Sequence, residues 1–276
     1  MSLLKRHSAL PGFGLSLGFT LTYLGLLVLI PMAVLVLRAA ELDRGTLLRV
    51  LLDPRVLAAF RLSAWTAAAA AGINLVFGSV VAWTLVRYEF PGRRFFDALV
   101  DLPFALPTAV SGITLTALCA PGGWVGGLLA RAGLPVAFTP LGIVTALVFI
   151  SLPFVVRILQ PAIADLDVEL EEAAAGLGAG RWQVLRRVIG PALLPALLTG
   201  FALAFARSLG EYGSVIFISG NMPMRTEIVP LLIVIKLEEF DVAGAAVIAV
   251  AMLAVSFLIL LGINLLQSWS ATRYAR

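Results

Sequence analysis

The residues of this chain that could do chemistry are few, and their spacing favours ion pairing over catalysis. Asp97 and Asp101 stand four residues apart, so a helix would place both carboxylates on one face. Such a pair works as a general acid and base only inside a substrate cavity that shifts its pKa values. Because Arg93 and Arg94 precede the two aspartates, we interpret the aspartates as members of interfacial ion pairs, with catalysis as the alternative.

Metal binding, covalent catalysis and nucleotide hydrolysis lack the groups that they require. The single histidine, His7, and the single cysteine, Cys119, cannot form a metal cluster or a Cys/His couple. A Walker loop needs a lysine at the end of a glycine-rich turn, and neither Lys5 nor Lys236 follows one. We therefore predict no catalytic residue, no metal and no cofactor in this chain.

The composition of the chain indicates that the elements carrying these groups lie in a membrane. Of the 276 residues, 61% are apolar and 13% are charged, and the mean hydropathy is +1.02. Soluble domains carry about a quarter charged residues, so we predict an integral membrane protein embedded in the lipid bilayer. The net charge of +4 is spread over loops and termini without a long basic run, which argues against a nucleic-acid partner.

Charge-free stretches predict the transmembrane helices. A helix of about 20 apolar residues crosses the hydrocarbon core, and the stretches that suffice are residues 62–86, 102–130, 132–156, 188–206 and 242–272. A further span at residues 15–37 follows Lys5 and Arg6; a signal peptide would have a shorter apolar region and a cleavage site that is missing here. The prediction is an all-α protein with about six transmembrane helices in a single transmembrane domain, residues 1–276.

Loop charges and interfacial aromatic residues suggest the orientation. With the N-terminus inside, a small majority of the Lys and Arg residues is cytoplasmic, which favours two cytoplasmic termini. Aromatic residues flank the predicted spans, as is typical of a membrane–water interface, with ordinary packing as the alternative. They are Trp83, Tyr88, Trp124, Trp269 and Tyr274.

The interval of residues 165–190 is unusually polar for such a chain. Its first half is acidic and carries small and apolar residues at intervals of three and four, the spacing of one helical face. Its second half has arginines between apolar positions. The pattern predicts two short amphipathic helices joined by a flexible corner at residues 178–180, with Pro191 opening the next span. The interval is either a docking element for a soluble partner or a solvated loop without one.

The same interval resembles the EAA motif of membrane subunits of binding-protein-dependent ABC importers. The matching segments are residues 172–174, Gly178 and residues 188–191, with valine at 188 and glycine at 190 where the family usually has isoleucine and leucine. In that family the motif forms coupling helices that fit a cleft on a separate ATPase. The contact residues that the resemblance implies are Glu171, Glu172, Ala173, Ala174, Gly178, Arg181 and Trp182.

Other blocks resemble the T-type permease subunit of sulfate/thiosulfate importers, from about residue 10 to residue 267. They are residues 11–12, 15–18, 101–110, 153–157, 207–213 and 238–241. The resemblance implies the type I importer permease fold, with a first helix and external loop at residues 10–58 and a permease core at 59–268. It also implies a pair of ATP-binding subunits carrying ATP and magnesium, a second related permease, an external sulfate-binding protein and the bacterial cytoplasmic (inner) membrane.

Two regions are candidates for the walls of an anion pathway. The fifth helix is expected to run over residues 191–218, about 42 Å long and too long for the bilayer core, so its outer third must tilt, break or project. Charges near a span are functional suspects, and Arg207 is expected to contact a doubly negative oxyanion beside Ser208, Gly210 and Glu211. A salt bridge between Arg207 and Glu211 that merely fixes the helix is the alternative.

The third span is expected to supply the opposite wall. Pro103 and Pro107 lack backbone donors and should bend this helix. Thr108 and Ser111 add hydroxyl groups nearby, with bonding to their own helix backbone as the alternative role.

The alternatives to a sulfate/thiosulfate permease belong to different classes of protein. A molybdate or tungstate permease shares the block at residues 207–211. A secondary anion transporter or a channel would carry intramembrane carboxylates or matched interrupted helices, and no internal repeat is visible. An intramembrane enzyme lacks catalytic groups.

Overall fold

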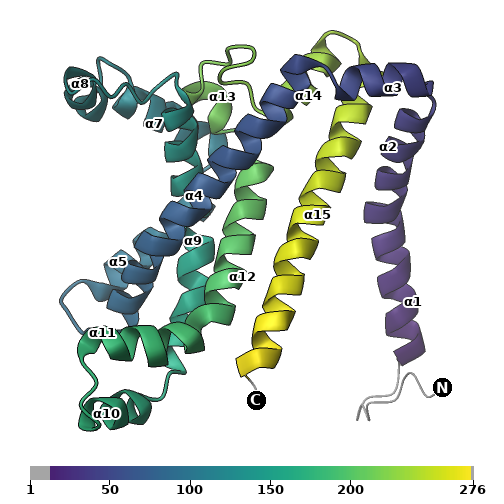
Figure 1. Cartoon of the computed structure of the whole chain (residues 1–276). Helices are drawn as coiled ribbons and strands as arrows, with labels where there is room; N and C mark the ends of the chain where they lie inside the picture. The colour runs from purple at the N-terminus through teal and green to yellow at the C-terminus, as the bar shows by residue number, and fades with distance from the viewer. Residues whose placement is uncertain (1–12, 275–276) are drawn as a thin grey trace.

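The computed structural model describes residues 13–274, and side chains up to residue 265. All regular structure in this part of the chain is helical, which confirms the predicted all-α fold class (Figure 1). Outside the described residues lie Lys5, Arg6, His7, Pro11 and Gly12, and likewise the side chains of Trp269 and Tyr274.

The helices follow one another with short connections. The first half of the chain forms α1 (Phe13–Leu24), η1 (Gly25–Leu29), α2 (Ile30–Ala40), α3 (Arg44–Leu51), α4 (Pro54–Arg87), α5 (Arg93–Val100), α6 (Leu102–Ala105), α7 (Thr108–Cys119) and α8 (Trp124–Arg131). The second half forms α9 (Pro140–Ala164), α10 (Val168–Gly176), α11 (Arg181–Val184), η2 (Leu185–Ile189), α12 (Gly190–Leu209), α13 (Val215–Ile218), α14 (Val229–Glu238) and α15 (Val242–Tyr274).

Five helices in the described residues are long and apolar enough to cross a bilayer. They are the unbroken helix α1–η1–α2, then α4, α9, the unbroken helix α11–η2–α12, and α15. The predicted third span, residues 102–130, is divided into α6, α7 and α8. The helices α7 and α8 meet at a bend of 46° and give a sixth span if the bent pair crosses the bilayer as one, which agrees with the prediction of about six transmembrane helices. Proline disfavours a helical residue before it, and Leu106, before Pro107, is extended (ψ 134°).

The central bundle consists of α4, α9 and α12, which pack along one another. Gly78 of α4 allows the close approach of α9, since a methyl group there would lie 3.1 Å from Val155. Asn74 joins the same two helices by donating hydrogen bonds to the Val148 carbonyl (2.9 Å) and the Ser151 hydroxyl (2.8 Å). The bundle therefore forms a rigid frame that carries the loops at both of its ends.

The first span lies at the edge of the molecule. α2 packs on α15, and α15 packs on α12 and α14, while α1 stands away from the central bundle (Figure 1). The apolar side chains of α1 are exposed. They suit contact with lipid or with another membrane protein.

The two ends of the bundle carry different elements. One end gathers α10 and α11 with the start of α1 and the end of α15 (Figure 1), and we call it the α10 end. The other end gathers α3, α8, α13 and α14. The polar interval at residues 165–190 thus lies on the same side as both described ends of the chain.

Candidate functional site

The helix α10 presents the segment that resembles the coupling motif. Asp167 caps its start by accepting a hydrogen bond from the backbone N–H of Glu169 (3.0 Å), which satisfies a donor that the helix leaves free. The helix ends at Gly176, and Gly178 follows in the left-handed region with a φ of +85°. A side chain added at Gly178 would meet no atom within 4 Å, so this corner faces open space.

Exposed side chains surround that corner. All of the predicted contact residues are exposed except Glu171 and Ala174, which are half-buried. Leu177 and Trp182 have exposed fractions of 90% and 70%. Large apolar side chains left open on a polar segment are typical of a protein–protein contact surface.

The second predicted helix of the interval is not a separate element. α11, η2 and α12 form one unbroken helix, so the prediction that Pro191 opens the next span is wrong. The π-helical turn η2 explains how proline is accommodated. The Gly190 N–H donates to the Leu185 carbonyl, five residues back, and this wider turn accommodates a ring that clashes with a regular α-helical turn.

An ion pair joins α10 to the end of α4. Arg87 Nη2 lies 2.6 Å from Glu171 Oε1, and both side chains are less than a quarter exposed. The Arg87 guanidinium also lies over the Trp83 ring, 5.1 Å from its centroid, which is a cation–π contact. A displacement of α10 would therefore be transmitted to a helix of 34 residues in the central bundle.

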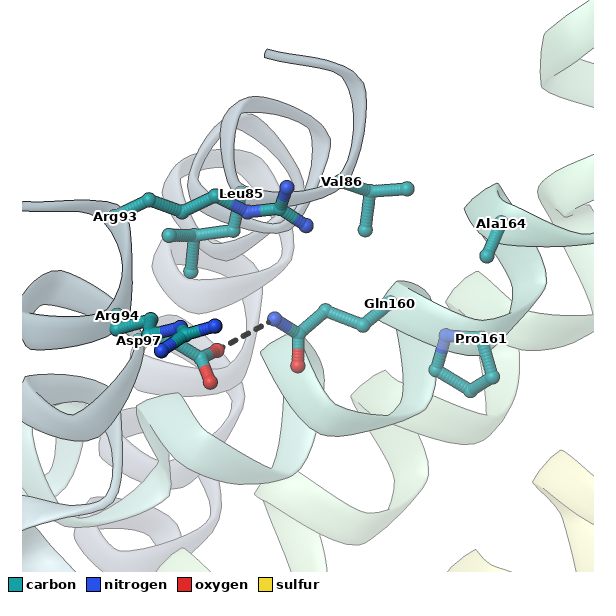
Figure 2. Close-up of a pocket in the computed structure, with 8 residues that line it drawn as sticks. All are labelled: Leu85, Val86, Arg93, Arg94, Asp97, Gln160, Pro161 and Ala164. Carbon is teal, nitrogen blue, oxygen red and sulfur yellow. Dashed lines mark hydrogen bonds between the residues drawn. The ribbon is translucent and has the colours of Figure 1, made fainter. Parts of the chain in front are cut away.

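A second ion-pair network ties α9 to the segment that enters the interrupted span. Arg157 donates to Asp97 Oδ1 (2.7 Å) and to both carboxylate oxygens of Asp101 (2.8 and 2.5 Å). Gln160 donates a further hydrogen bond to Asp97 (2.8 Å; Figure 2). This confirms the interpretation of the two aspartates as members of ion pairs. Their partner is Arg157 of α9, however, and not Arg93 or Arg94.

Hydrogen bonding keeps Asp97 ionised. The amide of Gln160, and then the Arg157 guanidinium, lower the pKa of the Asp97 carboxyl group below its ordinary value. A lowered pKa stabilises the folded protein at neutral pH, and this contribution is lost only as the pH falls below about 3.9. A general acid needs the opposite shift.

The end of α12 places Arg207 and Glu211 in contact. The helix ends at Leu209, and α13 (Val215–Ile218) is a separate short helix, so of the outcomes predicted for the outer third of residues 191–218 the structure shows the break. Arg207 Nη1 lies 2.6 Å from Glu211 Oε2, with Glu211 2% exposed and Arg207 32% exposed. Glu211 also accepts hydrogen bonds from the backbone N–H and the hydroxyl of Ser214 (3.0 and 3.1 Å). The Glu211 carboxylate therefore links the end of α12 to the segment that follows it.

The two predicted walls meet at this break. A methyl group at Gly213 would overlap the Thr108 hydroxyl, and one at Gly112 would lie 2.5 Å from the Ser214 carbonyl oxygen, so α7 packs directly on the segment after Gly210. Pro103 is buried, and Pro107 separates α6 from α7. Ser111 is buried and donates to the Pro107 carbonyl (3.4 Å), so the alternative of backbone bonding is confirmed for this hydroxyl.

The hydroxyl group of Ser208 lies at the same end of α12 and is not used in these contacts. Ser208 is buried, and its hydroxyl oxygen has no hydrogen-bond partner among the described residues. It lines a narrow crevice together with Ser63, Thr66 and Glu211. Buried hydroxyl groups usually have partners, so the Ser208 hydroxyl group is a polar group that this closed packing leaves unsatisfied.

The contact between α7 and the segment after α12 yields the first prediction. Replacing Gly112 with alanine should destabilise the protein by about 1–3 kcal/mol, because the new methyl group would press on a backbone oxygen. We expect the melting temperature of the purified protein to fall. Gly72→Ala is the matched control: no atom lies within 4 Å of the added carbon, and replacing a helical glycine stabilises by about 0.5–1 kcal/mol. Equal melting temperatures for the two variants would contradict the close approach.

Several interacting residues could not be found from the sequence. Arg87 and Arg157 are lone charges at the ends of spans, and this position is the signal that could have drawn attention to them. The pair of Arg55 and Glu227 also went unpredicted; two hydrogen bonds of 2.8 and 2.7 Å join them, and Glu227 is 1% exposed. It fastens the start of α4 to the segment before α14.

Comparisons with known proteins agree with this geometry. Residues 74–276 match the family described as "Binding-protein-dependent transport system inner membrane component". The chain is 47% identical to the sulfate transport system permease protein CysT of Escherichia coli (strain K12) over 268 residues, 97% of each chain. It is also 47% identical to a sulfate transport system permease protein of Synechococcus elongatus over 253 residues, covering 92% of this chain and 91% of that one.

Solved structures share the fold. A bacterial ABC transporter involved in the import of the acidic polysaccharide alginate superposes with a TM-score of 0.73 at 16% identity, over 93% of this chain and 94% of that one. The alginate transporter in complex with an alginate pentasaccharide-bound periplasmic protein gives a TM-score of 0.72 at 18% identity, over 91% and 92%. At such identities the likeness shows the fold alone.

Proposed function

The chain belongs to the family of binding-protein-dependent transport system inner membrane components, and we propose that it is the permease subunit of an ATP-driven importer of sulfate and thiosulfate. The type I importer permease fold and the similarity to sulfate transport permeases support this. The observation that carries the proposal is the exposed α10 corner, which bears the EAA-like segment and is tied to the central bundle by Arg87 and Glu171.

The mechanism follows from the contacts at the α10 end. Two partner ATPase subunits bind ATP and magnesium and grip the surface around Gly178 and Trp182. When they close, α10 moves, and the Arg87–Glu171 ion pair carries the movement to α4. Arg157, through Asp97 and Asp101, connects α9 with α5 and α6, so the same event reaches the interrupted span. Packed helices with two alternative arrangements turn such a shift into alternating access.

The anion pathway lies where α7 meets the end of α12. Arg207 offers a cation, and Ser208 and Gly210 add a hydroxyl group and a narrow backbone, opposite Pro107 and Thr108. Glu211 neutralises part of the Arg207 charge, so the contact with a doubly charged oxyanion is weak, as rapid release requires. An external binding protein then supplies most of the selectivity.

The partners follow from the same assignment. A second, related permease completes the pathway, and an external sulfate-binding protein delivers the anion. The chain spans the bacterial cytoplasmic membrane with both termini and α10 on the cytoplasmic side. The position of α10 at the same end of the bundle as both described ends of the chain supports this orientation (Figure 1).

Uptake by the reconstituted complex tests the proposed function. Vesicles containing the co-purified complex should accumulate labelled sulfate only when ATP is supplied to the ATPase side. Unlabelled thiosulfate should compete with this uptake, and molybdate should compete poorly. Preferential uptake of molybdate would reassign the substrate, and uptake that persists without the ATPase would favour a secondary transporter or a channel.

The ion pair between α10 and α4 yields the second prediction. Arg87→Gln and Glu171→Gln should each lower ATP-driven uptake several-fold, and the double variant should lose little more, because both single variants remove the same contact. We expect a coupling energy of about 1 kcal/mol, within the range for directly contacting groups. Arg131→Gln is the control, since Arg131 is exposed, lies in α8 at the opposite end of the bundle and has no ion-pair partner among the described residues. Additive losses from Arg87 and Glu171 would show that the pair does not transmit movement.

A further inference from the structure

The mechanism above assigns no ligand to a pocket at the α10 end of the bundle. It has a volume of about 500 Å³ and lies between the end of α4, the helix α5 and the end of α9 (Figure 2). Leu85 and Val86 form one wall, Pro161 and Ala164 another, and the remaining lining residues are Arg93, Arg94, Asp97 and Gln160.

The polar lining of this pocket carries an excess of positive charge. Asp97 is already engaged by Arg157 and Gln160. In the described part of the chain, no carboxylate lies within ion-pair distance of Arg93 or Arg94. Both arginine side chains point toward Gln160 in Figure 2, so their guanidinium groups converge on the pocket. Two converging guanidinium groups are suited to a phosphate or sulfate group.

The surroundings place this pocket at the surface of the bilayer. It lies at the ends of two spans, α4 and α9. On α5, the side chains of Phe95, Phe96 and Leu99 are 65%, 53% and 46% exposed. Exposed apolar side chains next to basic residues on a short helix are typical of an element that lies in the headgroup region.

We propose that Arg93 and Arg94 bind the phosphate group of an anionic membrane lipid in this pocket. The apolar side chains of α5 then contact the acyl chains, and the wall formed by Leu85 and Val86 encloses the headgroup. The recognition chemistry is that of a tetrahedral oxyanion, which free sulfate or phosphate in the cytosol shares. Because Leu85 and Val86 line the pocket and directly precede Arg87, its occupant stabilises the end of α4 to which α10 is attached.

The test measures lipid retention by the purified complex. The complex is prepared in nanodiscs of phosphatidylcholine containing phosphatidylglycerol, released into detergent and analysed by native mass spectrometry. Wild-type protein should retain phosphatidylglycerol in preference to phosphatidylcholine. Arg93→Gln/Arg94→Gln should reduce this retention roughly ten-fold, since each basic residue near the surface contributes to anionic-lipid binding. Arg93→Lys/Arg94→Lys keeps the charges and should retain most of the lipid.

A second double variant controls for general effects of charge, and competition by inorganic phosphate or sulfate distinguishes a lipid from a free oxyanion. Arg186→Gln/Arg187→Gln removes two exposed arginines from the same end of the molecule and should leave retention unchanged. The proposal is overturned if the two double glutamine variants lose the same amount of phosphatidylglycerol. It is also overturned if replacing Arg93 and Arg94 leaves the retention of this lipid unchanged. Displacement of the lipid by millimolar inorganic phosphate or sulfate also overturns the lipid assignment. Sulfate uptake is a separate measurement, so failure here leaves the transport function standing.

Discussion

Replacing Gly178 with aspartate is expected to abolish ATP-driven uptake while the partner ATPase continues to hydrolyse ATP. The added carboxylate would project from the α10 corner, where no atom of this chain lies within 4 Å, and would enter the surface that we propose as the ATPase contact. The left-handed conformation at Gly178 costs about 1–2 kcal/mol for most residues with a Cβ atom, but aspartate and asparagine adopt it more readily, so the introduced charge is expected to dominate. We expect uptake per ATP hydrolysed to fall by at least ten-fold.

Two further substitutions at the same position separate charge from strain. Gly178→Asn introduces a side chain of the same size without charge and tolerates the left-handed region, so it should retain more coupling than Gly178→Asp. Gly178→Ala should report the backbone strain alone. Uptake and hydrolysis are measured on the same reconstituted preparation. Wild-type coupling in Gly178→Asp would count heavily against the docking role of α10.

Removing Arg207 is expected to have the second large effect. Glu211 is almost completely buried, and Arg207 is its only ion-pair partner in the described residues. Breaking a buried pair leaves an uncompensated charge and costs about 3–5 kcal/mol. The two hydrogen bonds from Ser214 offset part of that cost, so we expect the lower end of the range. Arg207→Ala should therefore reduce both the amount of assembled complex and sulfate uptake, measured by immunoblot of membranes and by labelled-sulfate accumulation.

A double variant distinguishes a structural bridge from a contact with the substrate. Arg207→Ala/Glu211→Gln removes both charges, while the glutamine oxygen still accepts hydrogen bonds from Ser214. We expect assembly to recover and uptake to remain low, because the cation that we propose to meet the oxyanion is missing. Recovery of uptake to the wild-type rate would show that Arg207 only anchors Glu211.

Local features of the fold were predictable because short-range physics determines them. Charge-free runs located α4, α9 and α15, and the glycines after the acidic segment located the end of α10. Pro107 marked a disturbance in the third span, but whether proline bends or breaks a helix depends on its neighbours. Here Leu106 is extended and the helix is interrupted. At Pro191 the opposite occurred, because the turn η2 absorbs the ring and the helix continues.

The long-range ion pairs of the candidate site could not be predicted from sequence patterns. Arg87 and Glu171 are 84 residues apart, and Arg55 and Glu227 are 172 apart. No periodicity specifies such pairs, which arise only when the spans pack. The ion pair between Arg207 and Glu211 was open to sequence reasoning, as the alternative to an oxyanion contact, because the two residues are one helical turn apart. The further contacts of Glu211 with Ser214 required knowledge of where α12 ends.

The most direct test of the coupling role is a crosslink from α10. In a Cys119→Ser background, Ala174→Cys places a single thiol beside the exposed corner, and Gly122→Cys places one in the exposed turn at the opposite end of the bundle. A thiol–amine crosslinker applied to the assembled complex should join the α10 cysteine, and not the control, to a nucleotide-hydrolysing subunit. The yield should change when ATP is added. Absence of that product from Ala174→Cys, in a complex that still transports sulfate, would contradict the assignment of α10 as the point of coupling.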